Sequence, residues 1–180
     1  MNRASKIFLL TYFFISIGIP AQYLFGIKKA DAVTATIMVS FYFITSAIFG
    51  IIFSRLSDKL MKRRIFVLGG LLLIAIAFTG YFFASASSPL QLIVCSSFIG
   101  ISVGAYSPNS IALFTEMEPT ISKGKLMGYF HVVNSAGWAV GALVGGVVDQ
   151  YFGDLVFLFA AVSIIIGLSI YFFKIHDIPP

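Results

Sequence analysis

The polar and titratable residues of this sequence gather in a few places, and the densest group lies between Gly50 and Phe66. The eleven residues SRLSDKLMKRR hold five of the twelve Lys and Arg residues and one acid, Asp58. A solvated charge run is the usual explanation for such a cluster. The position of a lone acid among so many cations nevertheless makes this segment a candidate site.

Polar residues also recur at helical spacing inside two apolar stretches, so each set would share one face of a helix. The sets are Ser102, Tyr106 and Asn109, and His131, Asn134, Ser135 and Trp138. Polar groups at membrane depth usually face a bundle interior or a water-filled cavity, which makes both sets candidates to face a substrate. The alternative is interhelical hydrogen bonding, worth about 0.6 kcal/mol per contact. Gln22 and Tyr23, which follow Pro20 in the first apolar stretch, are further candidates.

No constellation typical of an enzyme, a metal site or a cofactor site stands out in the sequence. The acidic residues all fall at the ends of apolar stretches or between them, so none is placed as an intramembrane proton carrier. His131 is the one titratable candidate inside an apolar stretch, and histidine can exchange protons near neutral pH. Cys95 is the single cysteine, which predicts no disulfide framework. We expect no enzymatic activity, no metal and no cofactor.

The elements that would position these residues are long apolar helices. The chain is 59% hydrophobic and 11% charged, with a mean hydropathy of +0.99, whereas soluble domains are about a quarter charged. Its apolar stretches are long enough to cross a bilayer core of about 30 Å and lack the alternation of barrel strands. We predict an all-α polytopic membrane protein in which residues 1–180 form a single domain. The six predicted spans are 7–25, 34–53, 65–84, 90–114, 126–148 and 155–173.

The distribution of Lys and Arg predicts the orientation of this domain. Ten of these residues fall at the N-terminus, in the second and fourth connectors and at the C-terminus, and only Lys28 and Lys29 fall on the other side. Because cations near span ends stay on the cytoplasmic side, both termini are predicted to be cytoplasmic. Cations beside apolar spans indicate membrane orientation, so nucleic acid is not a predicted partner. We expect a multi-pass protein of the cell (plasma) membrane.

The charged segment resembles a motif of the major facilitator superfamily, G-x-L-x-D-[RK]-x-G-[RK]-[RK], which lies between helices 2 and 3. Asp58 takes the acidic position, and Ser54 and Met61 stand where the motif has glycines. The resemblance implies a gate motif whose acid faces the N-terminus of a helix in the other half of the transporter and helps to hold the cytoplasmic side shut. Its basic residues are Lys59, Lys62, Arg63 and Arg64.

The fifth span carries a second resemblance, because GWAVGALVGG is similar to the signature G-x-x-x-G-P-x-x-G-G in helix 5 of drug-exporting members. Ala142 replaces the proline, and the matching glycines are Gly137, Gly141, Gly145 and Gly146. The first three recur every four residues, so they would form one groove, the glycine groove, where another helix can approach closely. The groove can serve packing alone, or packing together with gating.

The resemblance extends over nearly the whole chain and implies one six-helix half of a twelve-helix transporter. Such a half contains two inverted three-helix repeats, in which helices 1 and 4 correspond. Gly18 and Pro20 in the first span and Gly104 and Pro108 in the fourth predict late interruptions in these two helices. Interrupted helices at matching positions indicate a substrate path.

The predicted function is transport of a small organic solute across the membrane by alternating access. The expected partners are the lipid bilayer, a small-molecule substrate and a second six-helix half, supplied by a homodimer or by a separate chain. In a homodimer, Asp58 would reach toward the start of helix 5 of the second copy. The alternatives are a truncated, non-transporting N-terminal half and a membrane scaffold or accessory subunit.

Overall fold

The computed structural model describes residues 1–175, without the side chains of Gln22 and Tyr23. Throughout this part of the chain the regular structure is helical, as predicted. The helices are α1 (Arg3–Gly18), α2 (Ala32–Leu60), α3 (Arg63–Phe83), α4 (Pro89–Met117), α5 (Lys123–Phe152) and α6 (Leu155–Lys174), with a π-helical turn at Ala21–Gly26 and a 3-10 turn at Ile27–Lys29.

Five of these helices, α2 to α6, are long and apolar enough to cross a membrane. The first apolar stretch differs, because α1 has only 16 residues and gives way to the π-helical turn after Gly18 and Pro20. A proline cannot donate the backbone hydrogen bond that a continuing α-helix requires. The interruption predicted for the first span is therefore present, while six membrane crossings stay a prediction.

The interruption predicted for the fourth span is wrong, since α4 runs through Pro108 without a break. Helices in membranes tolerate proline where neighbouring groups satisfy the backbone around it. Next to Pro108, the side-chain amide of Asn109 donates to the carbonyl oxygen of Ala105 at 2.7 Å within the same helix.

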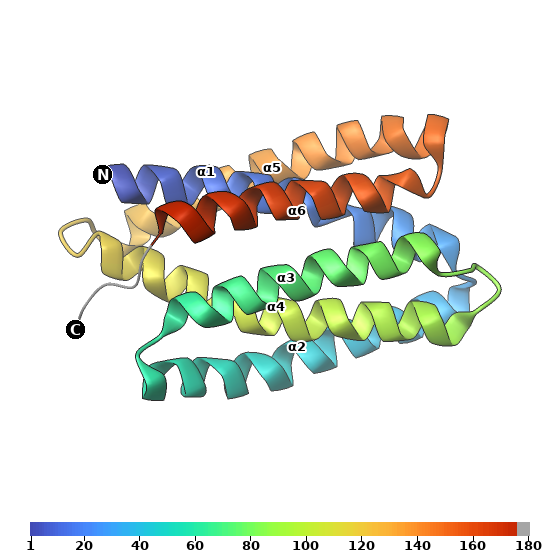
Figure 1. Ribbon diagram of the computed structural model, residues 1–180, viewed down its shortest axis with the longest axis horizontal. Helices are drawn as coiled ribbons and strands as arrows, with labels where there is room; N and C mark the ends of the chain where they lie inside the picture. The colour runs from blue at the N-terminus through green and yellow to red at the C-terminus, as the bar shows by residue number, and fades with distance from the viewer. Residues whose placement is uncertain (176–180) are drawn as a thin grey trace.

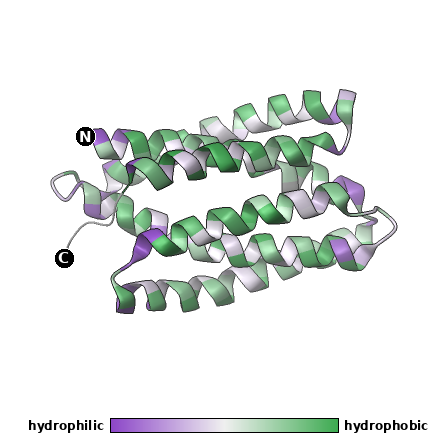
Figure 2. Ribbon diagram, in the orientation of Figure 1, coloured by the Kyte–Doolittle hydropathy of each residue, from purple (hydrophilic) through white to green (hydrophobic). Residues whose placement is uncertain are grey.

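The helices pack lengthwise in two groups, α1 with α5 and α6, and α4 with α2 and α3 (Figure 1). Contact between α3 and α6 joins the groups. The chain start and the α2–α3 and α4–α5 connections lie at one end, here called the basic end, and the other three connections lie at the opposite end. Hydrophilic residues collect at both ends, and hydrophobic residues line the helices between them (Figure 2).

Coverage by neighbouring helices is uneven across the bundle. In the most apolar stretch of α2 and of α5, 11% and 17% of the residues are buried, against 44% in α3, α4 and α6. An apolar surface of this extent is what a membrane or a protein partner covers. Helices α2 and α5 therefore present the two least covered faces of the unit.

Candidate functional site

The α2–α3 connection reverses the chain within two residues at the basic end. Met61 ends α2 in the left-handed conformation, with φ 53° and ψ 34°, and the Lys62 N–H donates to the carbonyl oxygen of Ser57. A side chain disfavours this conformation, whereas glycine adopts it freely. The glycine of the motif thus stands where the backbone is left-handed, and in this chain Met61 adopts that conformation.

The tight turn places Arg63, the first residue of α3, beside two carboxylates. Its Nη1 lies 2.7 Å from Asp58 Oδ1 on α2, and its Nη2 lies 2.9 Å from Glu116 Oε1 near the end of α4. The Arg63 side chain is 22% exposed and that of Asp58 60% exposed. One guanidinium therefore ties three helices together, while Asp58 stays accessible from outside the unit.

The remaining predicted gate residues have different surroundings. Arg64 donates to the carbonyl oxygen of Phe172 on α6 and stacks 5.5 Å from the centre of that ring. Lys59 is exposed and has no acidic partner among residues 1–175. Among the gate residues Asp58, Lys59, Arg63 and Arg64, the structure brings Asp58 and Arg63 into contact, joins Arg64 to α6 and gives Lys59 no acidic partner within residues 1–175.

Glu116 was not identified from the sequence as a partner of the motif. The signal for it is its place at the basic end, where it is one of few acids facing many cations. The next acid, Glu118, is buried and accepts a hydrogen bond from the backbone N–H of Asn2, which lowers the pKa of its carboxyl. The side-chain amide of Asn2 donates to the carbonyl oxygen of Met117 at 2.9 Å. These contacts join the start of the chain to the end of α4.

The opposite end holds a second set of ion pairs that the sequence analysis did not identify. Lys28 Nζ lies 2.8 Å from Asp149 Oδ2, and Lys29 Nζ lies 2.9 Å from Asp154 Oδ2. Lys29 is 10% exposed, donates to the carbonyl oxygen of Tyr81 at 3.0 Å and lies 5.4 Å from the centre of the Phe157 ring. The connection before α2 is therefore tied to the end of α5 and the start of α6. The available signal was that two cations and two acids fall on the same predicted side.

The glycine groove of α5 is filled by α1 of the same chain. A Cβ atom at Gly141 would lie 2.2 Å from the carbonyl oxygen of Ile17, and one at Gly137 would lie 2.5 Å from Ser16 Cβ. A Cβ at Gly145 would meet the Phe25 ring at 2.9 Å. The fourth glycine of the signature lies outside this contact, because a Cβ atom at Gly146 would have nothing within 4 Å.

A matching close contact joins α4 to α2. A Cβ atom at Gly100 would lie 2.4 Å from the carbonyl oxygen of Tyr42, and one at Gly104 would lie 2.7 Å from the backbone nitrogen of Gly50. Only residues without side chains allow helix backbones to approach this closely. Helices α1 and α5, and likewise α2 and α4, are consequently in direct backbone contact.

The polar stripe of α4 lies inside the unit. Ser102 is buried and donates to the carbonyl oxygen of Phe98, and the buried Asn109 accepts a hydrogen bond from Ser57 on α2. The buried Tyr106 packs beside Tyr12 of α1, with ring centres 6.4 Å apart. These three side chains therefore engage neighbouring groups within the bundle.

The polar stripe of α5 reaches the surface of the unit. His131 is exposed, Asn134 is half-buried and accepts a hydrogen bond from Ser16 at 3.0 Å, and Trp138 is half-buried. The stripe thus lies on one of the two least covered helices. The side chains of Gln22 and Tyr23 are outside the described residues.

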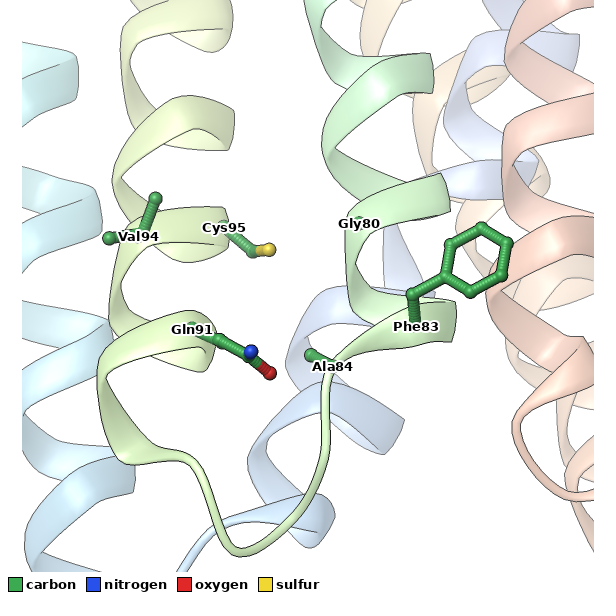
Figure 3. A pocket seen from close by; sticks show the side chains of 6 residues that line it. All are labelled: Gly80, Phe83, Ala84, Gln91, Val94 and Cys95. Carbon is green, nitrogen blue, oxygen red and sulfur yellow. The ribbon is translucent and has the colours of Figure 1, made fainter.

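Two apolar pockets lie away from the predicted site residues. The larger, of about 260 Å³, lies between α3 and α4 near the opposite end, where Cys95 and Gln91 of α4 point toward Gly80 and Ala84 (Figure 3). The other, of about 190 Å³, is partly open and is lined by residues of α2, α3 and α4, among them Phe53 and Phe66. The linings of both pockets contain none of the predicted site residues.

Comparison with known proteins gives matches to transporters. Quinolone resistance protein NorA of Staphylococcus aureus is 27% identical over 122 residues, which cover 68% of this chain and 31% of that protein. Putative metabolite transport protein YaaU of Escherichia coli is 28% identical over 152 residues, which cover 82% of this chain and 32% of that protein. The matches thus span about a third of each relative's length.

A protein-family match covers more of this chain than either pairwise match does. Residues 5–180 match the Major Facilitator Superfamily. The apolar helices, the charged α2–α3 turn and the glycine-rich α5 agree with this match. The chain belongs to the Major Facilitator Superfamily.

Proposed function

We propose that this chain transports a small organic solute by alternating access, with its basic end in the cytoplasm. The observation that carries the proposal is the uncovered face of α2 and α5 in a chain of a transporter family. In the proposed orientation the chain crosses the plasma membrane six times, the first crossing being α1 with the π-helical turn. The excess of Lys and Arg at the basic end supports cytoplasmic termini.

The helix contacts support two inverted three-helix repeats, α1–α3 and α4–α6. Exchanging the two repeats converts the α2–α4 contact into α5–α1 and the α3–α4 contact into α6–α1, and all four contacts are present. The two close backbone contacts follow the same exchange. Transporters built from repeats move one rigid unit against another around a central site.

The moving partner in this proposal is a second six-helix unit, and a second copy of this chain is our first candidate. The Asp58 side chain is 60% exposed even though it is paired with Arg63. A Cβ atom at Gly124 or Gly128, in the first turns of α5, would have nothing within 4 Å. Asp58 of one copy can then meet the N-terminus of α5 in the other, where the helix dipole favours negative charge.

The α5 stripe of His131, Asn134 and Trp138 is the proposed substrate-facing surface of this unit. The name of the relative NorA refers to quinolones, so a fluorescent quinolone is a reasonable first probe. An aromatic organic solute suits a surface formed by an indole ring, an imidazole and an amide.

Transport is tested with the purified 180-residue chain in proteoliposomes, by following quinolone flux with and without a pH gradient. We expect flux above that of empty liposomes, reduced at least fivefold in His131→Ala and in Asp58→Asn. Asp149→Asn is the matched control, because it also removes an acid paired with a cation at one end of the bundle, and its partner Lys28 is 71% exposed. Absence of flux for a panel of organic solutes would favour the non-transporting fragment or the scaffold.

The second copy is tested by cysteine cross-linking in native membranes, in a Cys95→Ser background. Phe43→Cys on α2 and Val140→Cys on α5 place thiols at exposed positions of the two least covered helices, and Ile76→Cys on α3 is an exposed control. We expect dimers from the α2 and α5 positions and monomer from the α3 position. Monomer from all three would exclude the homodimer and leave a separate half as the partner.

A further inference from the structure

The cations at the basic end fall into two classes. Arg63 is held by two carboxylates, and Arg64 by a carbonyl oxygen and an aromatic ring of α6. Arg55 and Lys59 on α2 are exposed, and within residues 1–175 neither has an acidic partner. The motif and the orientation of the chain account for the presence of these two cations but not for what they bind.

Arg55 and Lys59 lie on one face of the last two turns of α2. Together with Ile52 and Leu56 they line an open groove of about 330 Å³, here called the Arg55–Lys59 groove. The four residues are spaced i, i+3, i+4 and i+7, so they share one side of the helix. Ser57, which packs on α4, is buried on another side. The groove therefore faces away from the α4 contact.

The groove is positively charged and has no acid of its own. The neighbouring carboxylates, Asp58 and Glu116, are both occupied by Arg63. An anion with oxygen acceptors is the charge complement of a guanidinium and an ammonium one helical turn apart.

The floor of the groove indicates which anion this is. Ile52 and Leu56 are 47% and 40% exposed, and the exposed side chains of Ile44 and Ile48 continue the same i, i+4 row along α2. A soluble anion makes no use of such a row. A lipid uses both parts, because its phosphate meets the cations while an acyl chain lies along the apolar side chains.

We propose that the Arg55–Lys59 groove binds the headgroup of an anionic phospholipid, whose acyl chain follows the Ile44–Leu56 row of α2. The inference rests on the membrane orientation in the proposed function, which places the groove at the cytoplasmic leaflet. It does not require transport, so lipid binding and solute flux fail independently of each other. Basic clusters at the cytoplasmic ends of membrane helices are suited to anionic headgroups.

The test is native mass spectrometry of the purified 180-residue chain in detergent, titrated with phosphatidylglycerol. The double variant Arg55→Gln/Lys59→Gln is compared with Lys123→Gln/Lys125→Gln, which removes two exposed cations from the same end of the bundle. Arg55→Lys/Lys59→Arg keeps both charges and checks that substitution alone does not disturb the fold. Phosphatidylcholine and inorganic phosphate are titrated separately.

We expect a retained phosphatidylglycerol whose affinity falls about tenfold or more in the double Gln variant, since each cation near an anionic surface contributes about a fivefold effect. The Lys123/Lys125 variant and the charge-conserving variant should bind as the parent chain does. Equal loss in the Lys123/Lys125 variant would overturn the proposal, because the effect would then be general electrostatics. Equal binding of phosphatidylcholine, or displacement of the lipid by millimolar phosphate, would overturn it as well.

Discussion

The two ends of the bundle hold their charges in different ways. At the opposite end each lysine has its own acid, Lys28 with Asp149 and Lys29 with Asp154. At the basic end Arg63 alone holds two acids, Asp58 and Glu116. Two further cations at this end, Arg55 and Lys59 on α2, are exposed and have no acidic partner within residues 1–175.

The lysine charges at the opposite end are paired within the unit, whereas several charges at the basic end are exposed. Paired charges at the opposite end fasten the connection before α2 to α5 and α6, and they satisfy one another inside the unit. The basic end fastens α2, α3 and α4 with a single side chain and keeps an exposed acid and exposed cations for groups outside the unit. The first arrangement contributes to stability, and the second remains available for binding.

The largest effect is expected from Lys29→Met at the opposite end. Lys29 is 10% exposed and has an acid, a carbonyl oxygen and an aromatic ring as partners, so its loss should lower the free energy of unfolding by about 2 kcal/mol. The measurement is unfolding in mixed micelles by titration with a denaturing detergent. Lys28→Met is the matched control, because Lys28 is 71% exposed and an exposed pair contributes about 0.5 kcal/mol or less. Equal losses of unfolding free energy in the two variants would show that the buried lysine contributes no more to stability than the exposed one.

Arg63→Gln tests whether one side chain fastens the basic end. It leaves Asp58 and Glu116 without a cation, and we expect a loss of about 1 kcal/mol, reduced from that of a buried pair because both acids are partly exposed. Arg55→Gln on α2, which removes an exposed cation without an acidic partner among residues 1–175, is the control and should be nearly neutral. If Arg63→Gln unfolds at the same denaturant concentration as the parent chain, the ion pairs do not stabilise this end.

Met61→Gly should stabilise the turn that positions Arg63. The left-handed conformation of Met61 costs a residue with a side chain about 1 kcal/mol relative to glycine, so the gain is expected to be of that size or slightly less, since glycine is more flexible in the unfolded chain. Met61→Ala removes the same side chain but keeps the Cβ atom, and it should give no gain. Equal stabilisation by alanine would show that the side chain, and not the backbone conformation, is unfavourable.

The smallest effect is expected from mild acid, and it should involve both ends. Hydrogen bonds from Thr34 and Val33 lower the pKa of Asp31 below its usual 3.8, and the hydrogen bond from the backbone N–H of Asn2 lowers the pKa of Glu118 below its usual 4.5. A lowered carboxyl pKa contributes stability that is present above the usual value and is lost as the pH falls through the folded-state value. The thermal unfolding midpoint should be flat from pH 7 to about 5 and should fall below pH 4.5.

Single substitutions separate the two ends in this experiment. Asp31→Asn and Glu118→Gln should each flatten part of the decline. A midpoint that stays constant down to pH 3 would contradict both assignments. A decline that neither substitution alters would place the acid sensitivity elsewhere in the chain.

Local sequence patterns were sufficient to predict the helices and several contacts within them. Long apolar runs predicted the helical class, and the four-residue spacing of Gly137, Gly141 and Gly145 predicted a groove for another helix. The motif has a glycine where this chain has Met61, which is the signal that could have predicted the left-handed turn there, although the sequence analysis did not predict it. Each of these features depends on residues close together in the chain.

Features that join distant segments were not predictable in the same way. Glu116 meets Arg63 across 53 positions, and Asp149 meets Lys28 across 121. Periodicity shows which residues share a helix face but not which neighbour covers that face. The sequence therefore left both a substrate-facing surface and interhelical hydrogen bonding open for Ser102 and Asn109, which are buried. The break expected at Pro108 is absent. Membrane helices tolerate proline where neighbouring helices pack around it, and α4 packs against both α2 and α3.

The direct backbone contacts at Gly141 and Gly104 have a mechanical consequence. Side chains between two helices act as a deformable layer, because they can change rotamer and let the helices slide. Where a Cβ atom would already lie 2.2 Å from Ile17 or 2.7 Å from Gly50, that layer is missing and the interface is stiff. We expect the α1–α5 pair and the α2–α4 pair each to move as a rigid body. Any large displacement of this unit must then take place at the outer faces of α2 and α5.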